Sequence, residues 1–151
     1  MDKNKILIEL SESKNTKFGK EDFTRQSIPQ RVFSAVWAVE SEVNNGGFAQ
    51  YFSNDSAETA SFVVNAFETI KAPQTASICS RAIVVAFPAG LPQTPETIRA
   101  NAGNLMKAVL DELESLDEEF MAYPHNLTNL LFAYVSEHPE EFGELPRPDE
   151  D

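Results

Sequence analysis

The amino-acid sequence predicts an all-α fold, a single-domain bundle of five to seven helices. Apolar residues recur with the period of an α-helix along most of the chain, serine, threonine and proline stand where these stretches begin, and strands and helices do not alternate. The chain has 151 residues, of which 42% are hydrophobic, so it is long enough to bury one core and short enough to form one domain.

The first predicted helix follows an N-terminal segment and a polar loop. It begins just after Ser27, because this serine can cap it, Pro29 suits its first turn and Gln30 completes a capping box. Residues 44–47 (Asn-Asn-Gly-Gly) are expected to end this helix, since asparagine and glycine tolerate positive φ angles.

Two further helices are expected in the middle of the chain. Asn54 or Asp55 is suited to cap one whose apolar stripe ends at Ile70, and Pro73 opens the next. Residues 83–87 (Ile-Val-Val-Ala-Phe) finish the latter helix and are apolar on all sides, so they are also compatible with a buried strand. The helical period before them favours a central buried helix.

The last third of the chain predicts amphipathic helices. After a proline-rich connection, Thr94 and Pro95 restart a helical segment whose apolar stripe extends to Phe120, and a final helix runs from Asn126 to the proline at 139. The chain is therefore divided into an N-terminal segment and loop, a helical domain that ends with Phe142 folded back, and an acidic tail. These three parts are residues 1–27, 28–142 and 143–151.

The charge of the chain is negative and unevenly distributed. Acidic residues number 24 and basic residues 12, which gives a formal charge of −12, and the first 107 residues contain equal numbers of both. All of the net charge therefore belongs to the last third of the sequence. This balance argues against direct binding to nucleic acid and favours a basic protein as partner.

Few side chains are suited to catalysis or metal binding. Cys79 is the only cysteine and lies on an apolar helix face, so it is expected to be a buried hydrophobe, and the reducing cytoplasm is the expected compartment. His125 and His138 stand beside prolines near helix ends, without a metal-binding motif. We predict no catalytic residue, no cofactor, no metal and no membrane-spanning segment, and hence a protein that is not an enzyme.

The candidate partner-binding residues are carboxylates. Along the helix that ends near Phe120, Asp111, Glu114 and Glu118 fall on the side opposite the apolar stripe, where they form a row of negative charges. Such a row on a rigid frame could occupy a surface that is built to hold phosphates. The full set of predicted partner-binding residues is Asp111, Glu112, Glu114, Glu118, Glu119, Glu137, Glu140 and Glu141.

One segment carries an unusual motif of amides, glycines and aromatic rings. We expect it to be structural, because the glycines permit a turn, the rings suit a core and the amides can hold the turn by hydrogen bonds. Its residues are Asn44, Asn45, Gly46, Gly47, Phe48, Gln50, Tyr51, Phe52 and Asn54.

This motif, together with the segment from Tyr134 to Phe142, resembles a bacterial domain family named after a DNA-mimic protein. The resemblance covers about residues 28–142. It implies an all-helical fold and, for the characterised kind, an acidic surface that occupies the DNA-binding face of a transcription factor. The role would depend on the acidic residues and not on the motif.

The leading hypothesis is a non-enzymatic protein that binds a basic protein, such as a DNA-binding regulator, with a homodimer left open. One alternative is an interaction or immunity-type module that binds through an apolar groove near Phe48, Tyr51 and Phe52. The other is a carboxylate-dependent hydrolase, which requires a cleft where two carboxylates converge with His125 or Tyr123.

Overall fold

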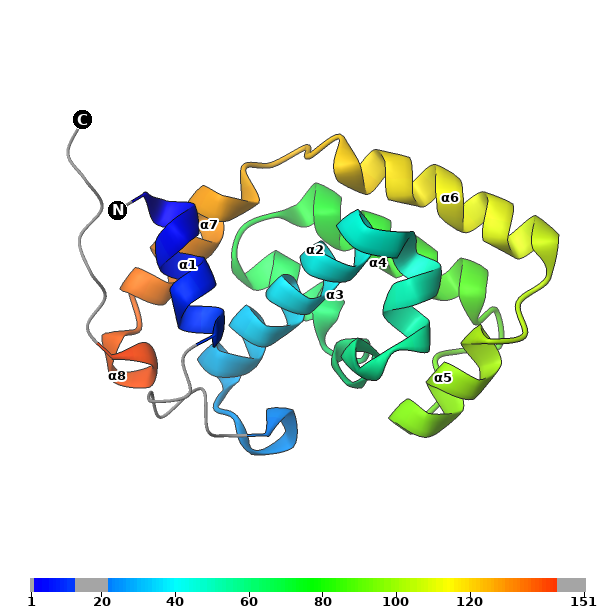
Figure 1. Cartoon of the computed structure of the whole chain (residues 1–151), viewed down its shortest axis with the longest axis horizontal. Coiled ribbons are helices and arrows are strands. Elements are labelled where there is room, and N and C mark those ends of the chain that lie inside the picture. The colour runs from blue at the N-terminus through cyan, green and yellow to red at the C-terminus, as the bar shows by residue number, and fades with distance from the viewer. Residues whose placement is uncertain (1, 13–21, 144–151) are drawn as a thin grey trace.

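The computed structural model describes residues 2–12 and 22–143, and within these ranges it contains helices and no strand (Figure 1). The predicted all-α class is confirmed, but the described residues form eight α-helices, which is more than the predicted five to seven. These helices are α1 (Lys3–Glu12), α2 (Ile28–Ser53), α3 (Val63–Thr69), α4 (Pro73–Ala86), α5 (Pro95–Ala102), α6 (Lys107–Met121), α7 (Leu127–Ser136) and α8 (Pro139–Phe142). Two short 3-10 helices are η2 (Phe23–Arg25) and η3 (Asp55–Thr59).

Helix α2 lies at the centre of the fold and contacts α3, α5, α6, α7, α8 and η3. Its start is where the sequence predicts it. The Gln30 N–H donates to Ser27 Oγ over 3.4 Å, and the Ser27 N–H donates to Gln30 Oε1 over 3.0 Å. This capping box satisfies two N–H groups that would otherwise have no partner at the helix start.

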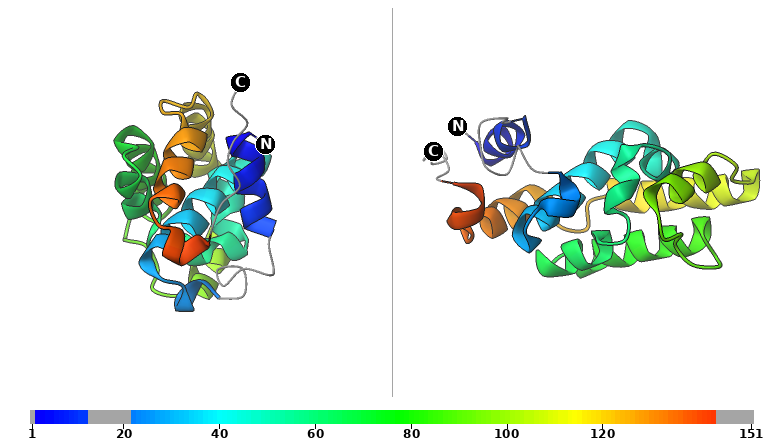
Figure 2. Two further views of the ribbon diagram at one scale, coloured as in Figure 1. Left: turned by 90° about the vertical axis from the view of Figure 1, so that its left-hand side faces the viewer. Right: turned by 90° about the horizontal axis from the view of Figure 1, so that it is seen from below.

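The helices form an elongated body with two different ends (Figure 1, Figure 2). Helices α1, α7 and α8 gather at one end and α5 lies at the other, while α6 runs along one side of the body. Helix α1 buries Ile6, Leu7 and Leu10 and contacts α7, so part of the segment before Ser27 is a helix that the sequence did not indicate.

The end of the described chain returns to the core. Phe142 is 3% exposed and its ring centroid lies 5.9 Å from that of Phe33, as predicted. Residues 13–21 of the predicted loop and 144–151 of the predicted tail lie outside the described residues.

The predicted helix from Asn54 or Asp55 to Ile70 is wrong at its start. Neither residue caps an α-helix; η3 comes first, and α3 begins only at Val63. The buried Tyr51 hydroxyl lies 2.6 Å from Thr59 Oγ1, within hydrogen-bonding distance, and so ties the tight turn of η3 to the end of α2.

The helical segment predicted from Thr94 onward begins as expected, because Thr94 Oγ1 accepts the Thr97 N–H over 3.2 Å. It divides into α5 and α6, however. The Asn104 side chain donates to the Ala100 carbonyl over 3.1 Å, and a side chain that bonds to the backbone in this way competes with helix continuation.

The apolar run at residues 83–87 is helical through Ala86, so the strand interpretation is excluded and the helix is confirmed. The expectation of a central buried helix is wrong, because α2 is the central helix and α4 is exposed along one side. Val84 is 61% exposed, since it lies on the side of α4 that the rest of the described chain does not cover.

The predicted end of the first helix at residues 44–47 is an interruption inside α2. Gly47 has a φ of 83° and a ψ of −178°, after which the helix resumes. The resumed helix has a new N-terminal end, and its Phe48 N–H donates to Asp117 Oδ1 of α6 over 2.7 Å. A carboxylate at this position satisfies the N–H and complements the helix dipole.

Gly47 is the position where a side chain is least tolerable. Its φ and ψ lie in a region that only glycine occupies readily, and a Cβ there would overlap the Asp117 carboxylate. We therefore expect Gly47→Ala to lower the free energy of unfolding by about 3–5 kcal/mol, from backbone strain and loss of a charge-assisted hydrogen bond. Urea unfolding followed by circular dichroism measures this loss.

Gly143→Ala is the matched control for that experiment. Gly143 has nearly the same backbone angles, φ 81° and ψ −179°, but a Cβ there meets no atom within 4 Å. The Gly143→Ala substitution should lower the free energy of unfolding by no more than the backbone strain alone, about 1–3 kcal/mol. Equal losses in the two variants would show that the contact with Asp117 contributes nothing.

Candidate functional site

Helix α6 presents a row of carboxylates to solvent. Its apolar face is buried through Leu113 and Phe120, each 1% exposed, and Asp111, Glu114 and Glu118 lie on the opposite side and are exposed. We call these three residues the acidic row. Residues three or four positions apart on a helix have Cβ atoms about 5–6 Å from each other, so the row is a closely spaced line of negative charge.

The charges of the acidic row are little neutralised by the described residues. The Lys107 ammonium lies 3.2 Å from an Asp111 carboxylate oxygen, but both side chains are mostly exposed, and such surface pairs are weak. Glu114 and Glu118 form no ion pair within residues 2–12 and 22–143. The structure therefore brings together the three carboxylates that the sequence placed in one line.

Glu112 and Glu119 lie on a different side of α6, facing α4. The Arg81 guanidinium donates two hydrogen bonds to the Glu119 carboxylate, over 3.0 and 2.9 Å. This bond lowers the pKa of Glu119 and raises that of Arg81. The charge of Glu119 is thus already compensated, while Glu112 lines a hollow between the two helices.

The remaining predicted residues lie elsewhere in the fold. Glu137 ends α7 and Glu140 and Glu141 belong to α8, which Figure 1 shows at the end of the body away from α5. Glu141 is half-buried, and its carbonyl accepts the Gln30 side chain over 3.0 Å. These three acids do not extend the acidic row of α6.

Asp117 of α6 was not among the predicted residues, and its role differs from that of its neighbours. It is partly buried and binds the Phe48 N–H. Burial raises its pKa, the hydrogen bond from Phe48 lowers it, and the charges of Glu114 and Glu118 raise it. One helix therefore carries a structural carboxylate beside the exposed ones.

The aromatic motif is structural, in agreement with the interpretation of its residues. Phe48, Tyr51 and Phe52 are 1%, 0% and 0% exposed. The alternative of an apolar binding groove at these rings is therefore wrong, because the core covers them completely.

The amides of the motif hold the turn and its surroundings. The Gln50 and Asn54 side chains donate to Glu42 Oε2 over 2.7 and 3.1 Å, and Asn44 donates to the Tyr123 hydroxyl over 2.6 Å. Asn45 is exposed, and Gly46 packs so closely on Gln50 that a Cβ would overlap its side chain. The contacts that the structure describes for the motif are therefore contacts within the fold.

A cavity of about 360 Å³ lies beside Glu40, Tyr123 and His125. The Tyr123 hydroxyl donates to Glu40 Oε1 over 3.4 Å, and His125 Nε2 accepts the Gln74 N–H at the start of α4 over 3.3 Å. The hydrolase alternative requires two carboxylates here, whereas Glu40 is the only one among the described residues that line the cavity. By accepting the Gln74 N–H, His125 caps the start of α4.

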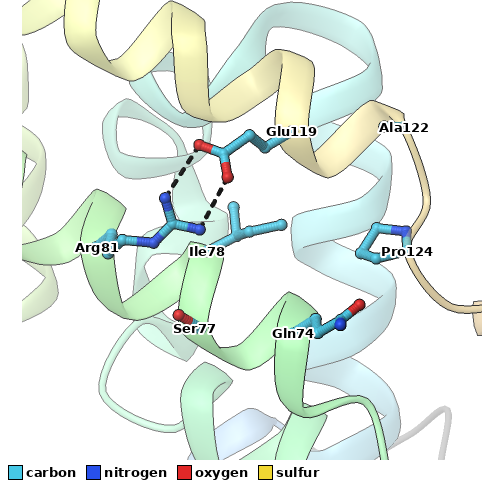
Figure 3. Close-up of a pocket in the computed structure, with 7 residues that line it drawn as sticks. All are labelled: Gln74, Ser77, Ile78, Arg81, Glu119, Ala122 and Pro124. Atoms are coloured by element: carbon cyan, nitrogen blue, oxygen red, sulfur yellow. Dashed lines mark hydrogen bonds and ion pairs between the residues drawn. The ribbon is translucent and has the colours of Figure 1, made fainter.

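A surface that was not predicted from the sequence lies between α4 and α6. Figure 3 shows Arg81 of α4 reaching Glu119 of α6 above Ile78, with Gln74 and Pro124 at the edge. The all-apolar run at residues 83–87 was the available signal, because one buried face cannot use apolar residues on every side of a helix. Within the described ranges, no group of histidine, cysteine and acidic residues could hold a metal ion, and no helix is long and apolar enough to cross a membrane.

The described residues form an all-helical protein in which α6 carries more exposed acidic residues than any other helix. Comparison with protein families matches residues 25–138 to the family described as DMP19-like protein. The match covers most of the chain, so the protein belongs to this family, and the resemblance inferred from its motif is confirmed. No curated protein and no solved structure matches the chain.

The pH dependence of stability should reveal the half-buried carboxyl group of Glu40. Burial raises its pKa above the ordinary value of 4.5, and the bond from Tyr123 opposes this only in part. The folded chain therefore binds a proton at Glu40 more tightly than the unfolded chain does. The free energy of unfolding thus rises as the pH falls from 7 toward about 4.5. We expect Glu40→Gln to flatten this rise in urea titrations.

Glu119→Gln provides the contrast, because Arg81 lowers the pKa of Glu119. Its contribution to stability is present above the ordinary value of 4.5 and is lost as the pH falls through the lowered pKa. The two variants should therefore change the slope in opposite directions. The same change in both would contradict the assigned roles.

Proposed function

We propose that this protein is a non-enzymatic, cytoplasmic protein that binds a basic DNA-binding protein and occupies its DNA-binding face through the acidic row of α6. The observation that carries this proposal is the exposure of Asp111, Glu114 and Glu118 on one line, with Glu114 and Glu118 unpaired in the described structure. Membership of a family named for a DNA mimic supports the same role.

The spacing of the row supports mimicry of a phosphate strand. Asp111 and Glu118 are seven positions apart, which corresponds to about 10.5 Å along the helix and hence about one charge per 5 Å. Each strand of B-DNA carries one charge per about 3.4 Å of its axis. The two charge densities are of the same order, so side chains that bind consecutive phosphates could reach consecutive carboxylates.

The rigidity of α6 also supports the proposal. Leu113 and Phe120 anchor the helix in the core, and the bond from Phe48 to Asp117 attaches it to α2. Charges carried by a rigid helix bind a complementary surface without the cost of ordering the backbone that bears them. Exposed charges of one sign also raise the encounter rate with an oppositely charged partner.

Capture from a lysate of the source cells tests this function. We expect the immobilised protein to retain a protein that binds duplex DNA, to release it in high salt, and to lose it to competing duplex DNA. The triple variant Asp111→Asn, Glu114→Gln and Glu118→Gln should bind the purified partner with about 1–3 kcal/mol less affinity, since each exposed pair contributes up to about 1 kcal/mol.

The matched control neutralises three exposed acids on other helices, with Glu9→Gln, Glu12→Gln and Glu68→Gln. It changes the net charge by the same amount, so it should affect the long-range encounter rate but not the bound contacts. Equal loss of affinity in both triple variants, or a partner that duplex DNA does not displace, would refute the proposed function.

A further inference from the structure

Helices α4 and α6 leave a groove at the surface that the proposed electrostatic contacts do not use. The two helices are antiparallel, because Gln74 lies near Pro124 at one end and Val84 near Glu112 at the other. The Arg81–Glu119 ion pair crosses between them and separates two hollows of about 380 and 430 Å³. Figure 3 shows the first of these hollows, with the ion pair at its border. We call the two hollows together the α4–α6 groove.

The second hollow has an apolar floor. Val84, Val85 and Leu116 line it, and Val84 is 61% exposed. An exposed β-branched side chain set in a hollow of this size is suited to contact an aliphatic side chain from another molecule, because both would then leave water.

The rims of the groove differ in charge. On α6 the groove is lined by two carboxylates. Glu119 is engaged by Arg81, whereas Glu112 stands at the apolar hollow and forms no ion pair among the described residues. The α4 rim bears Gln74, Ser77 and Ser80, and its single charge, Arg81, is engaged by Glu119. A negative rim beside an apolar floor is complementary to a segment in which lysine or arginine flanks an aliphatic residue.

The length of the groove indicates a helical segment. Gln74 and Val85 are eleven positions apart on α4, which corresponds to about 16 Å, or about three turns of a helix. Two antiparallel helices present a furrow into which a third helix can pack, with anchors repeating every three or four residues.

We propose that the α4–α6 groove binds a basic amphipathic helix of a partner protein. An aliphatic side chain of that helix fills the hollow at Val84, and a lysine or arginine contacts Glu112. The inference rests on the proposed function only for the basic character of the partner. It adds an apolar anchor, which would supply selectivity among basic proteins that the acidic row alone does not provide.

Two synthetic peptides of 14 residues serve as probes. One is a leucine–lysine amphipathic helix, and the other has glutamine in place of each leucine and the same charge. Isothermal titration calorimetry with the full chain should show tighter binding of the leucine peptide. Val84→Ser should lower the affinity for the leucine peptide by about fivefold and leave the affinity for the glutamine peptide unchanged, since only the apolar contact is lost.

Ile28→Ser is the matched control, because Ile28 is 58% exposed at the start of α2 and does not line the groove. It should leave both affinities unchanged. Amide chemical shifts should move at Ser80, Val84 and Ser115 when the leucine peptide is added. The loss caused by Val84→Ser should persist at high salt, because apolar contacts are not screened.

Other results would overturn the inference. Equal weakening by Val84→Ser and Ile28→Ser, or shifts that lie away from α4 and α6, would show that the groove is not the site. A dimer that sedimentation detects and Val84→Ser dissociates would assign the groove to a second copy of this chain.

The triple amide variant of the acidic row separates this inference from the proposed function. This variant should lower the affinity for both peptides by a similar factor and preserve the ratio of the two affinities. If the row variant retains the captured DNA-binding protein in full while Val84→Ser still weakens binding of the leucine peptide, the proposed function fails and the groove remains. If only the row variant has an effect, the groove inference fails alone.

Discussion

The hydrogen bond from the Phe48 N–H to Asp117 is the constraint on which the arrangement of the site depends. It joins the interruption of α2 to the middle of α6, across 69 positions of sequence. Gly47 makes the interruption sterically accessible, and the carboxylate compensates for the backbone N–H that the interruption exposes. The bond fixes α6 against α2 together with its buried apolar face, so the side opposite that apolar face is exposed to solvent, and the acidic row lies on that side.

Most of the fold could be predicted from the period of apolar residues and from helix caps. The capping box at Ser27 and the cap at Thr94 depend on neighbouring residues, so local sequence identified them correctly. The start of α3 could not be found in this way, because the bond between Tyr51 and Thr59 forms only when the core is assembled. The number of helices was underestimated because α1 and α8 lie in segments where no helical pattern was recognised, and because a local bond at Asn104 divides α5 from α6.

The same distinction between local and tertiary contacts applies to the candidate site. Helical geometry alone placed Asp111, Glu114 and Glu118 in one line, because their relative positions depend on one element. Whether an acid is paired depends on another element, so the sequence could not distinguish the compensated Glu119 from the unpaired Glu118. It also could not show that the acids of α8 lie apart from α6, nor that Val84 is exposed, since both follow from how the helices pack.

The position of Asp117 between Glu114 and Glu118 has a consequence for the energetics of any cationic ligand of α6. Repulsion from these two neighbours contributes to the raised pKa of Asp117. A cation held at the same two glutamates would offset that repulsion and make the Asp117 carboxylate easier to ionise. Complex formation at a pH where Asp117 is partly protonated would then release protons, and it would strengthen the attachment of α6 to α2 at the same time.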